Sequence, residues 1–465
     1  MTGAESLSTE DATLLCATAP EAQLQIGALC RSDGPPLRDG SGRLRIEDLR
    51  SHVGSRLHLV PRFRQRVVRV PFDLARPAWV DDEHFDLHLH VRTAELPAPG
   101  SEAELRAFVG ELLGQPLDPD RPLWDLWLID GLDGGDVAVL LRAHHVLADG
   151  LSLLRAAIAL LDVEAQPATA PDLAPWTPGP VPGRAALLVT AVLERRRNQL
   201  ALALGAARGL LDPRSAFRLA RSAVAAIGSP PHLAPALGLT GRVGSHRDFL
   251  WTSLPLEPLR RLGRSRGVTL NDIVLTVVAD ALRRVLDSEA SGHAGARNPI
   301  VLVPVGDAMH DDSGNSFSFM VAPLPVDSDG PDSMLQQVHD EMHDRKASGQ
   351  SSEMSSLFSV VDVVPIPLLR RLGPELLARQ PLVNLAVTNI PGSDAALYLM
   401  GSELKEMHPF ITGVGNIACI IGVLSYRDQL GIGITVDADV VADADGLLAA
   451  VVAAADELLA DEDDA

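Results

Sequence analysis

Residues 142–150 read RAHHVLADG, and this stretch places two histidines, an aspartate and a glycine at a spacing that could do chemistry. The ordinary pKa of imidazole is about 6.5, so a histidine can take a proton from a hydroxyl at neutral pH. General base catalysis of this kind accelerates a reaction by roughly 10²–10⁴. The candidate catalytic residues are therefore His144, His145, Asp149 and Gly150. The alternative is a structural histidine pair at the end of a strand.

The residues on either side of this motif predict a strand, a turn and a helix. DVAVLLRAHH (136–145) alternates as a strand does, so His144 and His145 should point to opposite faces, which argues against a metal ion held by both. A helical pattern, LSLLRAAIALLDV (151–163), follows directly. Asp149 could cap this helix or orient an imidazole through a hydrogen bond. Gly150 permits a positive φ or a close approach of the backbone.

The rest of the chain predicts two mixed α/β halves with a helical connection between them. Strands are expected at 27–31, 85–92, 123–132, 246–256, 298–305 and 382–392, a hairpin at 417–437, and helices at 101–117 (with Ser101 as its cap), 269–286 and 444–460. Residues 166–183 are rich in proline and alanine and are typical of a linker. The predicted organisation is a first half (1–165) with the histidine motif, a connection (166–245) and a second half (246–465).

Arginines are concentrated in residues 184–221, within the connection. A basic amphipathic stretch in an acidic chain is typical of contact with an anionic surface, such as a membrane or a lipid inclusion. The same arginines could bind the phosphates of CoA. A solvated helical face or a crossover between the halves would carry the same pattern, so these interpretations all remain open.

Composition excludes several classes of function. A net charge of −21 argues against nucleic acid as a partner, because phosphate binding needs a basic field. Three cysteines form no disulfide framework and no metal-binding spacing, which fits a reducing cytoplasm. We expect no signal peptide and no membrane span. HDEMH (339–343) has its glutamate one place too late for a zinc-protease helix, so no metal is predicted.

The motif HHVLADG matches HHxxxDG of the CoA-dependent acyltransferase superfamily, and its flanks resemble one family within it. That family is the bacterial wax ester synthase/diacylglycerol acyltransferase family. The resemblance extends over almost the whole chain, in order. Its blocks are LSTEDATLL (7–15), RPAWVDDEHFDLHLHVR (76–92), PLD (116–118) with RPLWD (121–125), NDIVL (271–275), TNIPG (388–392), LYLMG (397–401) and SY (425–426).

This resemblance implies a fold and a reaction. The fold would be two chloramphenicol acetyltransferase-like domains, each a mixed sheet packed with helices, with the site in a channel between them. The reaction would move a fatty acyl group directly from acyl-CoA, a substrate, to a long-chain alcohol or diacylglycerol, without a cofactor. His145 would be the general base, His144 its supporting neighbour, and Asp149 and Gly150 would shape the loop.

Substrate-binding roles are weaker inferences from family position. Asn271, Thr388 and Asn389 are candidates for hydrogen-bond donors to a tetrahedral intermediate. Asn271 would serve equally well as a helix cap, and Asn389 as part of the turn before Pro391. Trp124 is a candidate for the wall of an acyl tunnel, although core packing is the common role of such a residue.

The sequence departs from the family at two places. The family reads PVSxR or similar after a buried strand, whereas this chain reads PVGDA (304–308) and lacks the arginine. Its Met-His before the strand at 27–31 is Leu24-Gln25 here. Two other functions therefore remain open: a condensation-type transferase with a carrier-bound donor and a non-lipid acceptor, and a non-catalytic lipid-binding homologue.

Overall fold

The structure is a computed structural model that describes residues 4–17, 24–166, 175–189, 192–193, 196–197, 233–235, 237–289, 298–305, 318–348 and 366–463. Its helices are α1 (Thr9–Ala17), α2 (Ile46–Arg56), α3 (Leu87–His90), α4 (Glu102–Gly114), α5 (Gly150–Leu160), α8 (Leu256–Arg266), α9 (Leu270–Glu289), α10 (Pro331–Ser348), α12 (Ile366–Leu377) and α13 (Ala444–Asp463). Its strands are β1 (Ala4–Ser6), β2 (Gln25–Ser32), β3 (Gln65–Val68), β4 (Ala78–Asp81), β5 (Val91–Glu95), β6 (Trp124–Asp130), β7 (Val137–His144), β8 (Arg247–Pro255), β9 (Ile300–Val305), β10 (Ser318–Pro323), β11 (Leu385–Ile390), β12 (Tyr398–Leu399), β13 (Ser402–Ile411), β14 (Cys419–Tyr426) and β15 (Gln429–Asp437).

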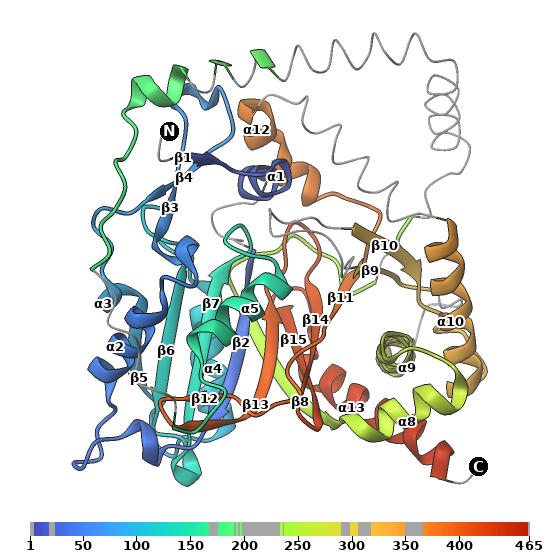
Figure 1. Cartoon of the computed structure of the whole chain (residues 1–465). Coiled ribbons are helices and arrows are strands. Elements are labelled where there is room, and N and C mark those ends of the chain that lie inside the picture. Colours follow the sequence, from blue (N-terminus) through green and yellow to red (C-terminus); the bar gives the residue numbers. More distant parts are fainter. Residues whose placement is uncertain are drawn as a thin grey trace.

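Two six-stranded sheets organise the molecule (Figure 1). The first has the order β12-β13-β2-β7-β6-β5 and the second β10-β9-β11-β14-β15-β8. A small sheet, β1-β4-β3, lies with α1 and α12 at one end of the first. Helices α2 and α5 share a hydrophobic core with one face of the first sheet, and α4 packs on the other. Helices α8, α9, α10 and α13 share the core of the second sheet.

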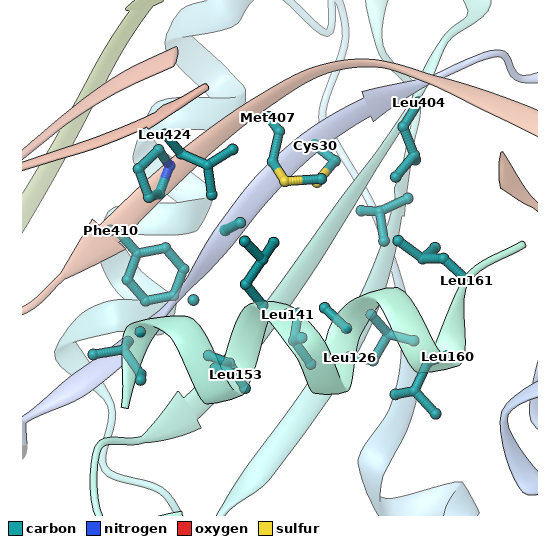
Figure 2. A pocket seen from close by; sticks show the side chains of 18 of the residues that line it. Cys30, Leu126, Leu141, Leu153, Leu160, Leu161, Leu404, Met407, Phe410 and Leu424 are labelled. Carbon is teal, nitrogen blue, oxygen red and sulfur yellow. The ribbon is translucent and has the colours of Figure 1, made fainter. Parts of the chain in front are cut away.

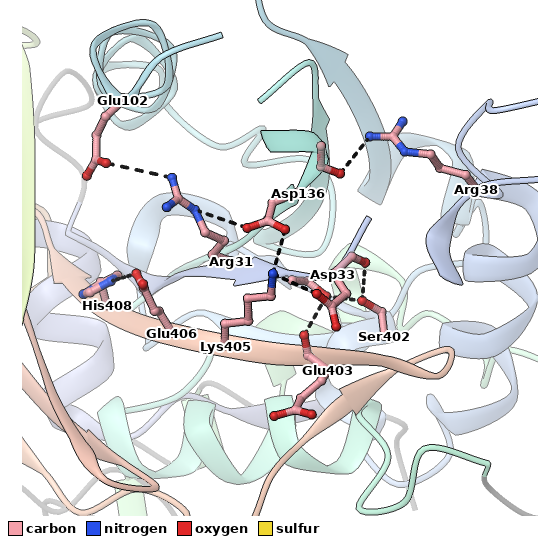
Figure 3. Close-up of polar contacts among 12 residues, drawn as sticks. Arg31, Asp33, Arg38, Glu102, Asp136, Ser402, Glu403, Lys405, Glu406 and His408 are labelled. Carbon is pink, nitrogen blue, oxygen red and sulfur yellow. Dashed lines mark hydrogen bonds and ion pairs between the residues drawn. The ribbon is translucent and has the colours of Figure 1, made fainter. Parts of the chain in front are cut away.

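The two halves are joined by a strand that crosses between them. β13 follows β11 in the second half of the sequence, yet it pairs antiparallel with β2 from Ile411↔Ile26 to Leu404↔Ser32. Polar contacts hold the end of β13 in place (Figure 3). Lys405 Nζ lies 2.8 Å from carboxylate oxygens of both Asp33 and Asp136. The first sheet is therefore built from both ends of the chain.

Most of the predicted elements are present, and local chemistry explains their ends. Ser101 caps α4: its Oγ accepts from the N–H of Ala103 and the Glu104 carboxylate accepts from the N–H of Ser101, which forms a capping box. The hairpin predicted at 417–437 is β14 and β15, and it turns at Arg427, whose φ is 55°.

The single strand predicted at 85–92 is wrong. Residues 87–90 form the helical turn α3, and the strand β5 begins only at Val91. The reason is a local cap, because the Asp86 carboxylate accepts from the N–H of His88 at 2.9 Å. Most of the arginine-rich stretch (184–221) and the departure at 306–308 lie outside the described residues. The boundaries at 165 and 245 stay a prediction.

Candidate active site

The histidine motif lies where β7 ends and α5 begins. His144 is the last residue of β7, pairs with Gln25 of β2, and is 1% exposed. Its Nδ1 accepts a hydrogen bond from the N–H of Val146 at 3.1 Å, which folds the chain back into the turn. Burial, and to a lesser extent the neighbouring His145, lowers the pKa of His144 to about 3. His144 is therefore a neutral, structurally fixed imidazole.

His145 is held in the turn that follows the strand. Its backbone N–H donates to the carbonyl of Leu24 at 2.9 Å. Desolvation lowers the pKa of its imidazole to about 4, while a hydrogen bond to its own backbone and the charge of Asp149 oppose that shift. His145 is therefore neutral at physiological pH, the form in which imidazole can accept a proton.

Asp149 and Gly150 serve the start of α5. Asp149 is the N-cap residue, and its carboxylate accepts from the N–H of Ser152 at 2.6 Å. A Cβ on Gly150 would lie 2.8 Å from Cδ1 of Ile390, at the end of β11. Of the two roles predicted for Gly150, the structure shows the close approach, because its backbone is helical. Gly150 is thus where the motif meets the second half of the chain.

A buried ion pair below the motif was not predicted. Arg142 and Asp125 are 4% and 8% exposed in their side chains and join at 2.6 Å. The Arg142 guanidinium also donates to the carbonyls of Leu112 and Gln115, at the end of α4. Gln25 completes this cluster: its amide donates to Gln115 at 2.9 Å, and its N–H donates to the Thr412 hydroxyl at 2.8 Å.

The sequence contained a signal for this pair. The turn at 133–135 joins β6 to β7. In the register of this hairpin, Ile129 pairs with Ala138, and four residues further from the turn Asp125 pairs with Arg142. An acidic and a basic residue directly opposite each other on paired strands is a stabilising arrangement. The pair holds the face of β7 that carries His144.

An apolar cavity of about 90 Å³ lies between α5 and the first sheet (Figure 2). Every residue along its walls is apolar; on α5 and its C-terminal end these are Gly150, Leu153, Leu154, Ala157, Leu160 and Leu161, and opposite them lie Cys30, Leu126, Leu141, Leu404, Met407, Phe410 and Leu424 among others. A space of about 10–15 Å³ is enough for one water, so this cavity takes a larger group. Its walls favour an alkyl chain over water.

The cavity begins beside the motif and follows α5. Gly150, the first residue of α5, lines the cavity together with its neighbour Ile390, and Leu161 lines it just past the other end of the helix. Eleven residues of helix at about 1.5 Å each span about 16 Å. An extended peptide advances about 3.5 Å for every three backbone bonds. By the same measure, a length of about 16 Å accommodates an extended alkyl chain of roughly 13 bonds.

The predicted substrate-binding residues are only partly brought together. Thr388 and Asn389 lie on β11, two residues and one residue before the Ile390 that meets Gly150. Thr388 is 8% exposed and Asn389 is partly buried. The end of β11 therefore approaches the motif.

Asn271 and Trp124 lie elsewhere. Asn271 is in the first turn of α9, and the cap there is Thr269, whose hydroxyl accepts from the N–H of Asp272. Trp124 is 1% exposed, stacks against His90 and donates from its indole to the carbonyl of Phe63 at 2.7 Å. It is absent from the cavity wall and packs in the core.

No described group of three or more His, Cys, Asp or Glu side chains is placed to hold a metal ion. His339 of the HDEMH stretch instead contacts the Asp272 carboxylate at 2.9 Å, joining α10 to α9. Within the described part of the chain, no helix combines the length and apolarity needed to cross a bilayer.

Two-sheet transferases share this architecture. A condensation domain of the calcium-dependent antibiotic synthetase superposes with a TM-score of 0.61 at 17% identity, covering 98% of this chain and 97% of that one. A wax ester synthase/diacylglycerol acyltransferase from Marinobacter aquaeolei VT8 superposes with a TM-score of 0.67 at 24% identity and covers 98% of both chains. The predicted class, two mixed α/β halves of the chloramphenicol acetyltransferase-like fold, is confirmed.

The family follows from the sequence matches. Residues 7–274 match the wax ester synthase/diacylglycerol acyltransferase catalytic domain, and residues 313–459 match the C-terminal domain of that family. The Mycobacterium tuberculosis protein named probable diacyglycerol O-acyltransferase tgs1 is 30% identical over 436 residues, covering 90% of this chain and 88% of its own. The chain belongs to the wax ester synthase/diacylglycerol acyltransferase family, and it is an acyltransferase enzyme of lipid synthesis.

Proposed function

We propose that this enzyme transfers a fatty acyl group directly from acyl-CoA to the hydroxyl of a long-chain alcohol or diacylglycerol, with His145 as the general base. The observation that carries the proposal is the pairing of a neutral imidazole with an apolar cavity whose wall begins at Gly150, in the same loop. Wax esters or triacylglycerols would be the products.

The reaction needs one proton acceptor and no resident cofactor. The neutral imidazole of His145 takes the hydroxyl proton of the acceptor on a ring nitrogen. The acceptor oxygen then bonds to the thioester carbonyl carbon. As the tetrahedral intermediate collapses, the carbon–sulfur bond breaks and the CoA sulfur recovers the proton from His145. Donors on β11, Thr388 and Asn389, are the candidates for stabilising the intermediate.

The three described cysteines support direct transfer over an acyl-enzyme. All are buried, and burial raises the pKa of both Cys30 and Cys419 to about 12, which keeps those thiols protonated. A nucleophilic cysteine needs the opposite, a lowered pKa.

The test is CoA release from palmitoyl-CoA with hexadecanol or dipalmitoylglycerol as the acceptor. We expect release that depends on the acceptor and falls at least about a hundredfold in His145→Ala, the scale of general base catalysis. The matched control is His343→Ala, an exposed histidine on α10, which should leave the rate unchanged.

Three results would contradict the proposal. A His145→Ala variant as active as the wild type would show that His145 is not the general base. A strict requirement for a pantetheine-bearing carrier would favour a condensation-type transferase. Binding of palmitoyl-CoA by the wild type without turnover would favour a non-catalytic lipid-binding role.

A further inference from the structure

Helix α12 exposes an apolar stripe. Leu368, Leu372 and Leu376 are four residues apart, so they lie on one face of the helix, and they are 46%, 44% and 68% exposed. Leucines in a monomeric protein are usually scattered when they are exposed, and a row of them marks an interaction surface. Helix α12 packs against α1 (Figure 1), with Gly373 buried, while the three leucines stay exposed.

Phe72 is a second exposed apolar residue close to α12. It is 82% exposed and lies in the short helical turn Pro71–Asp73, which contacts α12 and is tied to it by the ion pair of Asp73 with Arg370. Its φ of 60° is in the left-handed region, which is unfavourable for a bulky side chain. A strained conformation that holds an aromatic ring in solvent is a feature of functional surfaces. We name Leu368, Leu372 and Leu376, which share one side of the helix, the α12 face.

The charge around the α12 face is positive in an acidic chain. Residues 366–379 hold three arginines and one glutamate, a net charge of +2, whereas the whole chain carries −21. Arg371 and Arg379 are exposed. Apolar side chains flanked by arginines form the pattern of a helix that lies in the interface of an anionic bilayer.

The α12 face lies at the same end of the molecule as the histidine motif. A Cβ on Gly415 would lie 2.5 Å from the carbonyl of Leu377, so the end of α12 touches the loop after β13. Three residues earlier, Thr412 bonds to Gln25, the strand partner of His144. A lipid surface under α12 would therefore be close to the site that the proposed function assigns to a lipid acceptor.

We propose that the α12 face docks the enzyme on an anionic membrane surface, with its leucines inserted among the lipids and the neighbouring exposed arginines at the phosphates. This proposal rests on the proposed function in one respect: the lipid acceptor explains why the enzyme would need a lipid surface. The docking itself depends on the exposed residues and is measured without turnover.

The experiment is flotation of the full chain with vesicles of phosphatidylcholine and phosphatidylglycerol in equal parts. The test variant combines Leu368→Gln, Leu372→Gln and Leu376→Gln, which keep good helix formers on α12. Burying half of a leucine raises affinity about fourfold or more, so we expect the affinity for these vesicles to fall at least about thirtyfold. The matched control combines Leu59→Gln, Leu89→Gln and Val163→Gln, exposed apolar residues elsewhere, and should bind as the wild type does.

Two further measurements make the result specific. The wild type should bind pure phosphatidylcholine vesicles more weakly, and added salt should weaken its binding to the mixed vesicles. Acyl transfer between water-soluble butyryl-CoA and butanol should be equal in the wild type and the test variant, which shows that the variant is folded.

Either of two results overturns the proposal. One is unchanged flotation of the test variant. The other is a wild type that does not float and instead forms dimers that the test variant abolishes, because the α12 face would then be an interface between two copies of the chain. A wild type that floats yet transfers no acyl group to any acceptor would leave the docking surface standing and refute the proposed function alone.

Discussion

The low pKa of His145 sets the pH range in which it can act as a base. Only the neutral imidazole accepts a proton, and burial keeps it neutral down to a pH of about 4. We predict that kcat/KM for acyl transfer is flat from about pH 8 to 5.5 and falls to half near pH 4, rather than near the ordinary histidine value of about 6.5. A pH–rate profile with palmitoyl-CoA and hexadecanol measures this.

Acid also destabilises the fold, so the profile needs a control. His144 and His145 titrate near 6.5 when unfolded and well below it when folded, so the unfolded state binds more protons between those values. Stability is therefore fully present above about pH 6.5 and is lost as the pH falls toward 4. Circular dichroism at each pH separates unfolding from protonation of the base. A fall of kcat/KM to half near pH 6.5 in a fully folded enzyme would refute the assignment of the buried His145 as the base.

Gly150 allows a second prediction at the residue scale. A Cβ on Gly150 would lie 2.8 Å from Cδ1 of Ile390, so Gly150→Ala should displace the Ile390 side chain from its place beside the motif. We expect kcat/KM to fall about tenfold or more, since catalysis is sensitive to misplacement by about an ångström.

Replacing Ile390 by valine should restore the space. Ile390→Val removes that methyl, so the variant with both Gly150→Ala and Ile390→Val should regain most of the activity, although Ile390→Val alone costs about 0.5–1.5 kcal/mol of stability. The four kcat/KM values form a double-mutant cycle. Additive losses would show that the contact is irrelevant.

At the scale of elements, α5 should determine which acyl chains are accepted. Ala157 lines the cavity, whereas Ala159, also half-buried on α5, does not. We predict that Ala157→Phe fills the cavity and lowers kcat/KM for palmitoyl-CoA about a hundredfold or more while sparing butyryl-CoA, since each methylene excluded from an apolar site loses about 0.8 kcal/mol. Ala159→Phe is the control and should preserve the preference for long chains. A shift confined to the alcohol series would assign the cavity to the acceptor.

Local chemistry made several elements of the site predictable. Alternation in 136–145, the helical pattern after Gly150 and the side chain of Asp149 predicted β7, α5 and its cap from the sequence. The strand predicted at 85–92 was wrong because the alternation in FDLHLHVR favours a strand, whereas Asp86 can cap a helical turn. The local hydrogen bond from the N–H of His88 to Asp86 stabilises the helical turn instead. Arg142 and Asp125 were overlooked because their meaning depends on hairpin register rather than on a motif.

At the scale of the whole molecule, β13 shows why the remaining fold could not be predicted. Nothing within 402–411 specifies β2 as its partner, since the two strands are separated by more than 350 residues in the sequence. Its side chains instead pack on both faces of the first sheet: Leu404 and Met407 belong to the core under α5, and Phe410 belongs to the core under α4, where it contacts Phe249 of β8. The cavity and the α12 face depend on such distant pairings and are invisible to sequence patterns.

Because β13 pairs with β2 of the first sheet and contacts β14, β15 and β8 of the second, we predict that the two halves unfold together. Cys30 on β2 and Cys419 on β14 are buried reporters of the first and second sheets. In a urea titration with pulses of a thiol reagent and mass spectrometry, both should become reactive at the same midpoint, as in a two-state transition. Loss of β13 would expose the edge of β2, open the core under α5 and remove the strand that β14 and β15 contact, so we expect both sheets to open in one transition. Reaction of Cys419 at clearly lower urea than Cys30 would show that the second sheet opens independently of the first.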